Sequence, residues 1–346
     1  MKKHLSFFLS LVFLALLMAT AVAYNSTKPR VMILQSYEPE YAWTRDVDEG
    51  LNRIINRWTG YSVTRHYMNT KQHSDPEWLN RAGIIARRTI KQTNPKVLIA
   101  VDDLAQSLAA KYFINDLNME IVFAGVNGSV EPYGYDKATN VTGIFEHKQL
   151  RPIKESILAL ESKKKSPNLT PSLVYVLDPS PSLGIGKDKI DEYDWSPIIY
   201  KGSIVAKDYP DWKKIILEQG EKVDYIIVAN YRELAISGPG TTYASAKEVM
   251  TWTDRESKVP VIGINAFNVE DGAMISLGVS PFEQGEVAAQ MAQMILEKNI
   301  RAGTIPMRQN FQYIVAIREA SLQLRNMELP AIYEAFGRAT ENFIEK

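Results

Sequence analysis

The chain has 346 residues, no cysteine, and equal numbers of basic and acidic residues, 40 of each. A chain without cysteine has no disulfide framework and no thiolate metal site. Its zero formal net charge, with Lys and Arg scattered along the sequence, argues against nucleic acid as a partner. The length exceeds the roughly 100 to 200 residues of one domain, so we expect two lobes.

The N-terminus has the three parts of a secretory signal peptide. Lys2 and Lys3 form a basic start, an apolar run follows from Leu5 to Met18, and Ala21-Val22-Ala23 provides a small-residue cleavage site. We predict a signal peptide of residues 1–23, cleaved after Ala23, and a mature protein in the periplasm. The alternative is an uncleaved anchor, because the apolar run with its small-residue tail approaches the roughly 20 residues that span a bilayer.

After the signal peptide, short β-rich runs alternate with amphipathic segments of helix length. This alternation predicts parallel sheets built from βαβ units. The first predicted strands are Val31 to Gln35, Tyr61 to Tyr67, Val97 to Val101, Ile121 to Ala124 and Asn140 to Glu146, and the predicted helices are Trp43 to Trp58, Pro76 to Gln92, Leu104 to Phe113 and Gln149 to Ser162.

A connector rich in Lys, Ser and Pro, Lys163 to Pro171, leads into a second series of the same kind. A long helix late in this series carries Val287, Met291, Met294 and Ile295 at helical spacing, which is typical of a core face. The predicted strands of the series are Leu173 to Leu177, Ile198 to Val205, Tyr225 to Ala229, Val259 to Ile264, Ala273 to Leu277 and Phe311 to Ile317.

These two series predict an α/β fold with two Rossmann-like lobes. Each lobe has a parallel sheet flanked by helices, and several chain crossings form the hinge between them. We assign residues 28–147 and 273–305 to lobe 1, residues 148–272 and 306–328 to lobe 2, and residues 329–346 to a C-terminal helical tail. Such a topology leaves a cleft between facing strand ends.

Four stretches carry a resemblance to a known superfamily: ILQSYEPEYAWTRDVDEGL, IAVDDLAQSLAAKYF, VFAGVNGSVEPYGY followed by NVTGIFE, and DGAMISLGVSPFEQGEVAAQMAQMIL. Their order, together with the signal peptide, resembles the type I periplasmic-binding-protein superfamily. Within it, the chain is most similar to ABC transporter substrate-binding proteins related to the tryptophan and sugar binders, including solute-binding-like proteins found beside sensor kinases. The resemblance covers nearly the whole mature chain. It implies two lobes that close on a small solute, without catalysis, and leaves the solute open.

Candidate ligand contacts follow from the geometry of such sheets. Open α/β sheets bind ligands just past the carboxyl ends of their strands, so the first polar or aromatic residues there are the candidates. In lobe 1 these are Ser36, Tyr37, Trp43, Asp102, Asp103 and Asn127, and in lobe 2 they are Asp178, Asn230, Tyr231, Asn265 and Phe267.

The lobe 1 candidates each have a ligand role and a structural alternative. Ser36, with the N–H groups of the following helix start, is suited to an anionic group such as a carboxylate, or else is an ordinary turn residue. Tyr37 and Trp43 offer faces that stack on a ring, or else fill a hydrophobic plug under the loop. Of Asp102 and Asp103, we expect one to accept hydrogen bonds from the solute and the other to cap the next helix.

The remaining candidates are polar residues that suit a small polar solute. Asn127 and Asn265 offer both donor and acceptor, which favours binding over a role in a turn. Asp178, which precedes Pro179, is either a cap or a ligand contact. Carboxylates, aromatic rings and an anion-favouring turn together suit a zwitterion with an apolar or ring portion, such as an amino acid. A sugar would use the same aromatic and carboxylate side chains.

The sequence contains no catalytic motif. It has neither a GxSxG elbow nor an HExxH pair, and Gly184 to Lys189 lacks P-loop spacing. Ser237 to Tyr243 is a glycine-rich turn before a helix, which is typical of a plain loop, and the alternative is a turn that approaches an anion. The four histidines, His4, His66, His73 and His147, have no metal-ligand spacing. We therefore expect no catalytic residue, no metal site and no cofactor.

The function predicted from the sequence is that of an extracytoplasmic solute-binding protein. We expect a monomer that captures a small polar or aromatic solute by hinge closure and delivers it to an ABC transporter permease. One alternative is a sensory binding protein that presents the solute to a membrane receptor or histidine kinase. The other is a secreted α/β enzyme.

Overall fold

The computed structural model describes residues 2–148, 150–164, 166–179, 183–237 and 242–345. The chain divides into two compact units, of which unit 1 comprises residues 1–145 and 281–308, and unit 2 comprises residues 146–280 and 309–346. It therefore passes between the units three times, after Phe145, after Ser280 and after Arg308.

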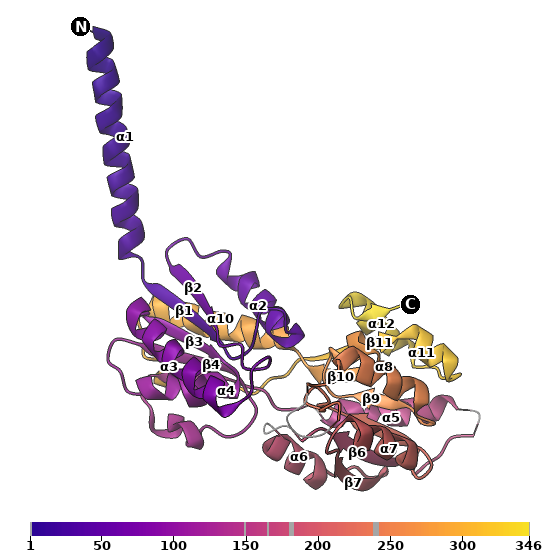
Figure 1. Ribbon diagram of the computed structural model, residues 1–346. Helices are drawn as coiled ribbons and strands as arrows, with labels where there is room; N and C mark the ends of the chain where they lie inside the picture. The colour runs from indigo at the N-terminus through magenta and orange to yellow at the C-terminus, as the bar shows by residue number, and fades with distance from the viewer. Residues whose placement is uncertain (1, 149, 165, 180–182, 238–241, 346) are drawn as a thin grey trace. The chain divides into compact units, whose positions relative to one another are not determined.

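The N-terminal segment is one continuous helix, α1 (Lys2–Thr27) (Figure 1). Its stretch from Phe7 to Thr27 is long and apolar enough to cross a membrane, and none of it is buried against the rest of the protein. A signal sequence and a membrane anchor both have this character, so the helix fits either expectation.

Unit 1 is built on a five-stranded, fully parallel sheet, as the sequence predicts. The strands lie in the order β2-β1-β3-β4-β5, and Val31 of β1 pairs with Val63 of β2 on one side and Val97 of β3 on the other. The strands are β1 (Arg30–Gln35), β2 (Ser62–Tyr67), β3 (Val97–Val101), β4 (Glu120–Val126) and β5 (Val141–Phe145).

Helices cover both faces of this sheet (Figure 1). α3 (Pro76–Thr93) and α4 (Asp102–Leu108) share one core with the sheet, while α10 (Pro281–Lys298) packs on β3, β4 and β5 and against α2 (Ala42–Ile55). The helix predicted from Leu104 to Phe113 is divided, because α4 ends at Leu108 and a 3₁₀ turn, η1 (Ala110–Phe113), follows. Three further 3₁₀ turns are η2 (Glu131–Tyr133), η3 (Tyr135–Lys137) and η4 (Ala302–Thr304).

Unit 2 has a seven-stranded sheet in the order β12-β11-β10-β9-β8-β6-β7. The five strands from β6 to β10 are parallel, β11 runs antiparallel to β10, and β12 runs parallel to β11. The strands are β6 (Ser172–Leu177), β7 (Ile199–Val205), β8 (Tyr225–Val228), β9 (Val261–Gly263), β10 (Ile275–Val279), β11 (Tyr313–Arg318) and β12 (Phe343–Ile344).

Two hydrophobic cores lie on the two faces of the unit 2 sheet. One includes side chains of α5, α6 and α11, and the other includes Trp212 of α7 and Met250 of α8. The helices are α5 (Leu150–Lys163), α6 (Leu183–Glu192), α7 (Tyr209–Gln219), α8 (Ala246–Glu256), α9 (Asn268–Asp271), α11 (Glu319–Leu324) and α12 (Ala331–Ala339).

The predicted lobe boundaries need two corrections. The segment 273–277, assigned to lobe 1, forms β10 in the unit 2 sheet, where Ile275 pairs with Ile262 of β9 and Ile317 of β11. Residues 329–346, predicted as a separate helical tail, include β12, which pairs with β11 and extends the same sheet. The apolar run identified β10 but not its partners, and β12 was not predicted as a strand, because both depend on pairing between distant segments.

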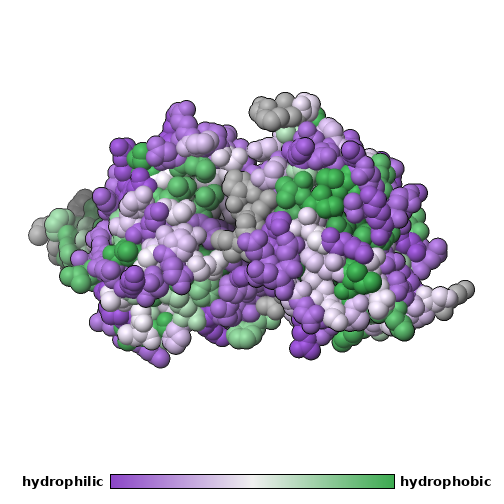
Figure 2. All heavy atoms as spheres, turned by 90° about the horizontal axis from the view of Figure 1, so that it is seen from below, coloured by the Kyte–Doolittle hydropathy of each residue, from purple (hydrophilic) through white to green (hydrophobic). Residues whose placement is uncertain are grey.

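The surface of both units is mostly hydrophilic on the face that Figure 2 shows, with hydrophobic residues in small groups. Outside α1, the exposed large apolar side chains include Ile199 on the edge strand β7 and Leu217 on α7. Scattered apolar side chains of this kind are normal for a protein in water.

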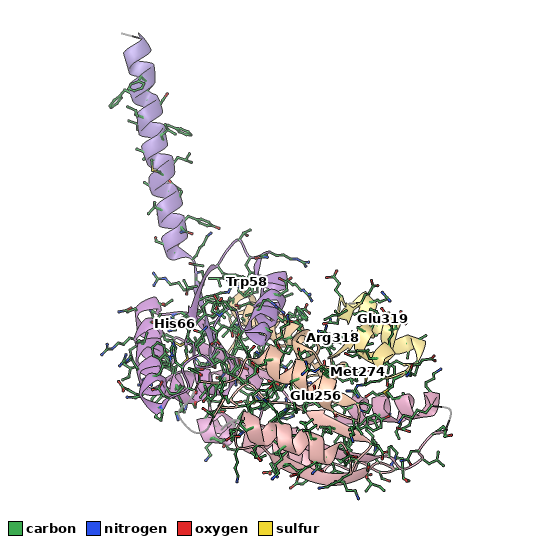
Figure 3. The ribbon with its side chains drawn as sticks, turned by 45° about the vertical axis from the view of Figure 1, so that its right-hand side comes forward. Trp58, His66, Glu256, Met274, Arg318 and Glu319 are labelled. Atoms are coloured by element: carbon green, nitrogen blue, oxygen red, sulfur yellow. The ribbon has the colours of Figure 1, made fainter. Side chains whose placement is uncertain are left out.

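His66 on β2 gives unit 1 a predicted pH dependence (Figure 3). Burial lowers the pKa of its imidazole below the ordinary value of 6.5, because desolvation disfavours the charged form. A lowered pKa in the folded state means that stability present above the unfolded pKa is lost as pH falls through the folded pKa. We expect urea unfolding at pH 7.5 and 5.0 to show a smaller loss for His66→Gln than for the wild type. Equal losses in both proteins would contradict this assignment.

Candidate functional site

The two units repeat one strand order, and this places equivalent loops at equivalent strand ends. The order β2-β1-β3-β4-β5 in unit 1 corresponds to β7-β6-β8-β9-β10 in unit 2. In such sheets the crevice for a ligand opens where the strand order reverses, at the carboxyl ends of the first strand and its neighbours. The loops after β1 and β3, and after β6 and β8, are therefore the first places to look for a site.

Ser36, directly after β1, is fully buried and its hydroxyl has two protein partners. Its Oγ donates to the carbonyl of Val101 at 2.7 Å and accepts the N–H of Ala105, in the first turn of α4, at 2.8 Å. The structure thus gives Ser36 the turn role. Its hydroxyl also accepts an N–H group in the first turn of α4, which is the role that we expected Asp102 or Asp103 to play. Val101, the residue that precedes α4, makes no side-chain hydrogen bond that caps this helix.

Tyr37 is half-buried beside two residues that the sequence reading did not single out. Its ring meets Tyr41 edge to face, with 5.3 Å between the centroids, and Lys71 Nζ lies 5.3 Å from the Tyr37 centroid. Lys71 also lies 6.0 Å from the Tyr41 centroid. This aromatic pair with its cation stands at the ends of β1 and β2.

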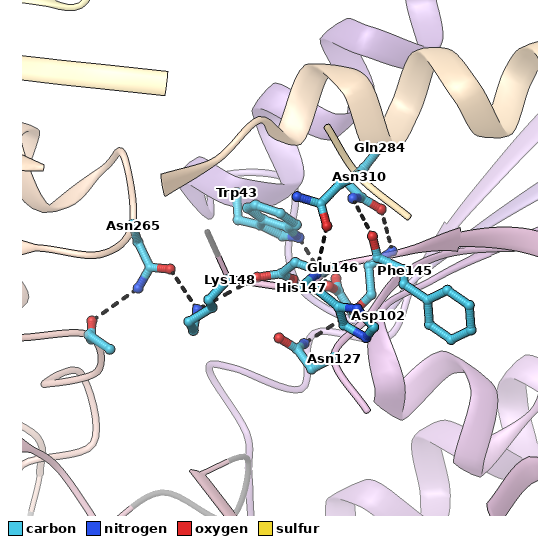
Figure 4. Close-up of polar contacts among 12 residues, drawn as sticks. Trp43, Asp102, Asn127, Phe145, Glu146, His147, Lys148, Asn265, Gln284 and Asn310 are labelled. Atoms are coloured by element: carbon cyan, nitrogen blue, oxygen red, sulfur yellow. Dashed lines mark hydrogen bonds and ion pairs between the residues drawn. The ribbon is translucent and has the colours of Figure 1, made fainter. Parts of the chain in front are cut away.

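Trp43 and Asp102 form a buried pair rather than two separate ligand contacts (Figure 4). Trp43 is 8% exposed and its indole Nε1 donates to Asp102 Oδ1 at 3.0 Å. Asp102 has a left-handed φ of 66°, and a Cβ added at Gly125 on β4 would lie 2.7 Å from the same oxygen. The close approach of Gly125 and the strained backbone of Asp102 fix this carboxylate at the strand ends.

Asp103 and Asn127 lie in contact at the ends of β3 and β4. Asn127 Nδ2 donates to Asp103 Oδ2 at 3.0 Å, and the hydroxyl of Tyr133 donates to Asp103 Oδ1 at 2.7 Å. Burial, together with the charge of Asp103, raises the pKa of Tyr133, so this tyrosine stays a donor. The structure therefore brings together two of the predicted residues and adds Tyr133 to them.

The Trp43–Asp102 pair yields a stability prediction. Trp43→Phe keeps an aromatic plug but removes the donor to a buried carboxylate, which we expect to lower the free energy of unfolding by about 1–3 kcal/mol. Trp58→Phe is the matched control, because the Trp58 indole N–H has no hydrogen-bond partner among the described residues. Urea unfolding followed by circular dichroism measures both variants. A Trp43→Phe variant as stable as Trp58→Phe would show that the hydrogen bond contributes nothing.

In unit 2, Asp178 and Asn230 connect the loops after β6 and β8. Asp178 is 1% exposed and its Oδ2 accepts the N–H of Glu233 at 2.9 Å. Its own N–H donates to the carbonyl of Asn230 at 3.0 Å. The Asp178 carboxylate therefore holds the loop after β8 in place, and Asn230 contributes its backbone to the same connection.

Tyr231 belongs to the hydrophobic core, and the residue after it is a new candidate. Tyr231 is fully buried, and its hydroxyl donates to Asp271 Oδ2 at 2.6 Å and accepts from Asn268 Nδ2 at 2.9 Å. Arg232 donates to the same Asp271 oxygen at 2.5 Å, and its guanidinium carbon lies 4.7 Å from the ring centroid of Phe267. Phe267, a predicted contact, thus carries a cation on its face.

Burial and neighbouring charges both change the pKa of Asp271, and burial has the larger effect. Burial raises the pKa of Asp271 above its ordinary range, against the opposing effect of Arg232. Burial also raises the pKa of Tyr231, and the Asp271 charge adds to this. Desolvation of this carboxyl, whose side chain is 14% exposed, thus has a larger effect on its pKa than the ion pair with Arg232.

Asn265, after β9, contacts a lysine at the chain crossing (Figure 4). Lys148 Nζ donates to Asn265 Oδ1 at 3.1 Å and lies 3.8 Å from Glu146 Oε1. The Asn265 amide also donates to the carbonyl of Ala229 at 3.1 Å. Sequence reasoning missed Lys148 because it follows β5, whose loop was not searched for site residues.

Side chains fix the chain on either side of its crossings. In unit 1, Gln284 accepts the Gly125 N–H at 2.8 Å and donates to the Phe145 carbonyl at 3.0 Å. In unit 2, Asn310 Oδ1 accepts the His147 N–H at 2.7 Å. The segments around residues 145, 147, 284 and 310 are thus anchored within their own units (Figure 4).

The described residues include no group of three or more His, Asp or Glu side chains that could hold a metal ion. The glycine-rich stretch from Ser237 to Tyr243 lies partly outside the described residues, as does part of the segment after Asp178. Among the described residues, the side chains at the strand ends are carboxylates, amides, aromatic rings and the cations Lys71, Lys148 and Arg232. Such a set can hold a small polar molecule through hydrogen bonds and ring contacts.

The fold is similar to that of several solved structures, and one segment of the chain matches a family model. Residues 226–330 match the family model described as "ABC transporter substrate binding protein". The chain is similar to a ligand-free, open substrate-binding protein with adhesive properties from Clostridium difficile, at 15% identity and a TM-score of 0.65 over 91% of this chain and 98% of the other. It is also similar to a Streptococcus pneumoniae ABC domain in complex with L-Trp, at 13% identity and a TM-score of 0.62 over 90% and 98%.

A third similar structure is a carbohydrate transporter solute-binding protein from Agrobacterium radiobacter in complex with D-arabinose. Identity is 10% and the TM-score 0.54, over 90% of this chain and 99% of the other. Comparison with curated proteins gave no match. The chain has the type I periplasmic-binding-protein fold, with two α/β units of parallel sheets flanked by helices.

Proposed function

We propose that this chain is an extracytoplasmic solute-binding protein that captures a small solute between its two units and delivers it to an ABC transporter permease. The observation that carries the proposal is the repeated strand order, with polar and aromatic side chains at equivalent strand ends in both units. The family-model match of residues 226–330 supports it, because that segment includes the loops after β8 and β9.

The solute that suits these side chains is amino-acid-like or sugar-like. The solute contacts that we propose are Tyr37, Asp103 and Asn127 in unit 1, and Asn265 and Phe267 in unit 2. Ser36, Trp43 and Tyr231 act through packing and hydrogen bonds inside the protein. Of the similar structures, one is in complex with the amino acid L-Trp and another with the sugar D-arabinose.

The proposed mechanism is closure at the three chain crossings. A solute that docks on one unit gains further contacts when the other unit closes on it, and this shifts the population toward the closed form. The permease then recognises the closed form and receives the solute. In this scheme α1 is the export signal, cleaved after Ala23, and the mature protein acts as a monomer in the periplasm.

The test is a ligand screen on the mature protein, residues 24–346. Thermal shift against the amino acids and common sugars, followed by calorimetry on each hit, should identify a solute that raises the midpoint of unfolding. Uptake of that radiolabelled solute should fall in cells that lack the protein and return when the gene is restored. Turnover of the hit, or normal uptake without the protein, would overturn the proposal.

A further inference from the structure

Arg232 is the residue of the unit 2 loops whose position the proposed function does not yet explain. It lies on the loop after β8, the strand between β6 and β9, and its side chain is 26% exposed. On one side it is paired with Asp271, and on the other its guanidinium lies over the ring of Phe267. It is therefore a cation at the carboxyl end of a central strand, held in one orientation by two side chains.

The chemistry of a guanidinium makes this orientation useful. Its planar fork has five N–H donors, more than a single carboxylate can accept, and it matches a second carboxylate in a bidentate arrangement. An arginine that is already stacked and paired loses little further side-chain freedom when it binds. Lysine has neither the planar shape nor the fixed fork.

Carboxylates and cations lie together in the strand-end loops of both units. Unit 1 carries Glu38, Asp102 and Asp103, with Lys71 beside Tyr37. In unit 2, Asp178 lies after β6, Asp271 is paired with Arg232, and Lys148 lies against Asn265 after β9. Among the cations, Arg232 has the planar donor group that matches a carboxylate of a solute.

We propose that Arg232 is a specificity-determining residue that binds a carboxylate of the solute, so the solutes of this protein are carboxylate-bearing molecules. This inference rests on the proposed function and narrows it. The sequence suggested a site for an anionic group at the turn of Ser36, but the Ser36 hydroxyl bonds to other groups of the protein. We therefore assign the anion site to the loop after β8. Amino acids and sugar acids share the required group, and neutral sugars lack it.

The experiment measures selectivity, because loss of affinity alone would not distinguish binding from support of the loop. The mature protein is titrated by calorimetry with each amino acid and with its primary amide, and with glucuronate and glucose. We expect the wild type to bind a carboxylate compound at least about 30-fold more tightly than its neutral counterpart. Whether that compound is an amino acid or glucuronate identifies the source of the carboxylate.

Three variants then assign the effect. In Arg232→Gln the ratio between acid and neutral counterpart should fall to within a few-fold of one, and Arg232→Lys should restore only part of it. Asp271→Asn removes the partner charge but keeps the guanidinium, so it should retain the ratio even if the overall affinity falls. Arg255→Gln, on an exposed residue of α8, is the surface control and should behave as the wild type does.

The outcomes separate the two proposals. If no compound binds, the proposed function fails and this inference fails with it. If glucose or the amides bind as tightly as the acids, the binding function stands and the role of Arg232 is overturned. The same holds if Arg232→Gln keeps the wild-type ratio.

Discussion

Replacing Gly285 by alanine should lower the stability of unit 1 sharply, although alanine is the better helix former. Gly285 lies on α10, and a Cβ there would overlap the backbone carbonyl of Val47 on α2 and lie 2.5 Å from the nitrogen of Leu51. These are backbone atoms, so the clash is relieved only by moving one helix away from the other. Overpacking of this kind costs about 1–3 kcal/mol and more when backbone must shift.

The size of the effect follows from two opposing contributions. Alanine gains up to about 1 kcal/mol over glycine in a helix, while the separation of the helices removes dispersion contacts along their whole interface. Gly50 on α2 makes the reciprocal approach to Phe282 on α10, so the contact is close from both sides. We expect a net loss of about 3 kcal/mol, which corresponds to roughly 6–12 °C in the thermal midpoint for a unit of this size.

Differential scanning calorimetry of the mature protein measures this change, with Gly60→Ala as the control. A Cβ at Gly60 would have nothing within 4 Å, so that variant should keep the wild-type midpoint or gain slightly through reduced freedom of the unfolded chain. A Gly285→Ala protein with an unchanged midpoint would mean that α2 and α10 do not pack through their backbones.

The sequence predicted the fold class because its signals are local. Buried parallel strands read as continuous apolar runs, such as Val97 to Val101, and every predicted strand is present in the structure within a few residues. The membership of β10 in the second sheet was missed because an apolar run does not encode its pairing partner. The short strand β12 was missed for the same reason, since only its pairing with β11 makes it a strand.

The strand ends could be predicted from the sequence, but the contacts of the side chains that lie there could not. The rule of strand ends located Asp103, Asn127, Asn265 and Phe267 correctly at the ends of β3, β4 and β9. Whether a side chain faces a ligand or the protein depends on contacts between distant residues, as with Trp43, whose partner Asp102 is 59 residues away.

Arg232 was passed over for a related reason. It is the fourth residue after β8 ends at Val228, and the rule takes only the first polar or aromatic residues. Its orientation depends on Asp271, the last residue of α9, and on Phe267, the residue before that helix. No local pattern in the sequence around Arg232 reports those contacts.

Gln284→Leu should also destabilise unit 1, through hydrogen bonds rather than packing volume. Gln284 is fully buried on α10, and leucine is close to it in size. The substitution removes the acceptor of the Gly125 N–H and the donor to the Phe145 carbonyl. A buried backbone group that loses its partner costs about 1–3 kcal/mol, so we expect a loss of about 2–6 kcal/mol for the two together.

Gln290→Leu, at an exposed position of the same helix, is the control for the change in residue type and should stay within about 0.5 kcal/mol of the wild type. Urea unfolding measures the two variants side by side, and equal stabilities would remove Gln284 from the contacts that hold unit 1 together.

The position of these hydrogen bonds adds a functional readout. Phe145 is the last residue before one crossing and Gln284 is the fourth after another, so loosening them frees two of the three connections in which the proposed closure takes place. If closure depends on fixed ends at these crossings, Gln284→Leu should weaken binding of the identified solute at temperatures where unit 1 is still folded, and Gln290→Leu should not.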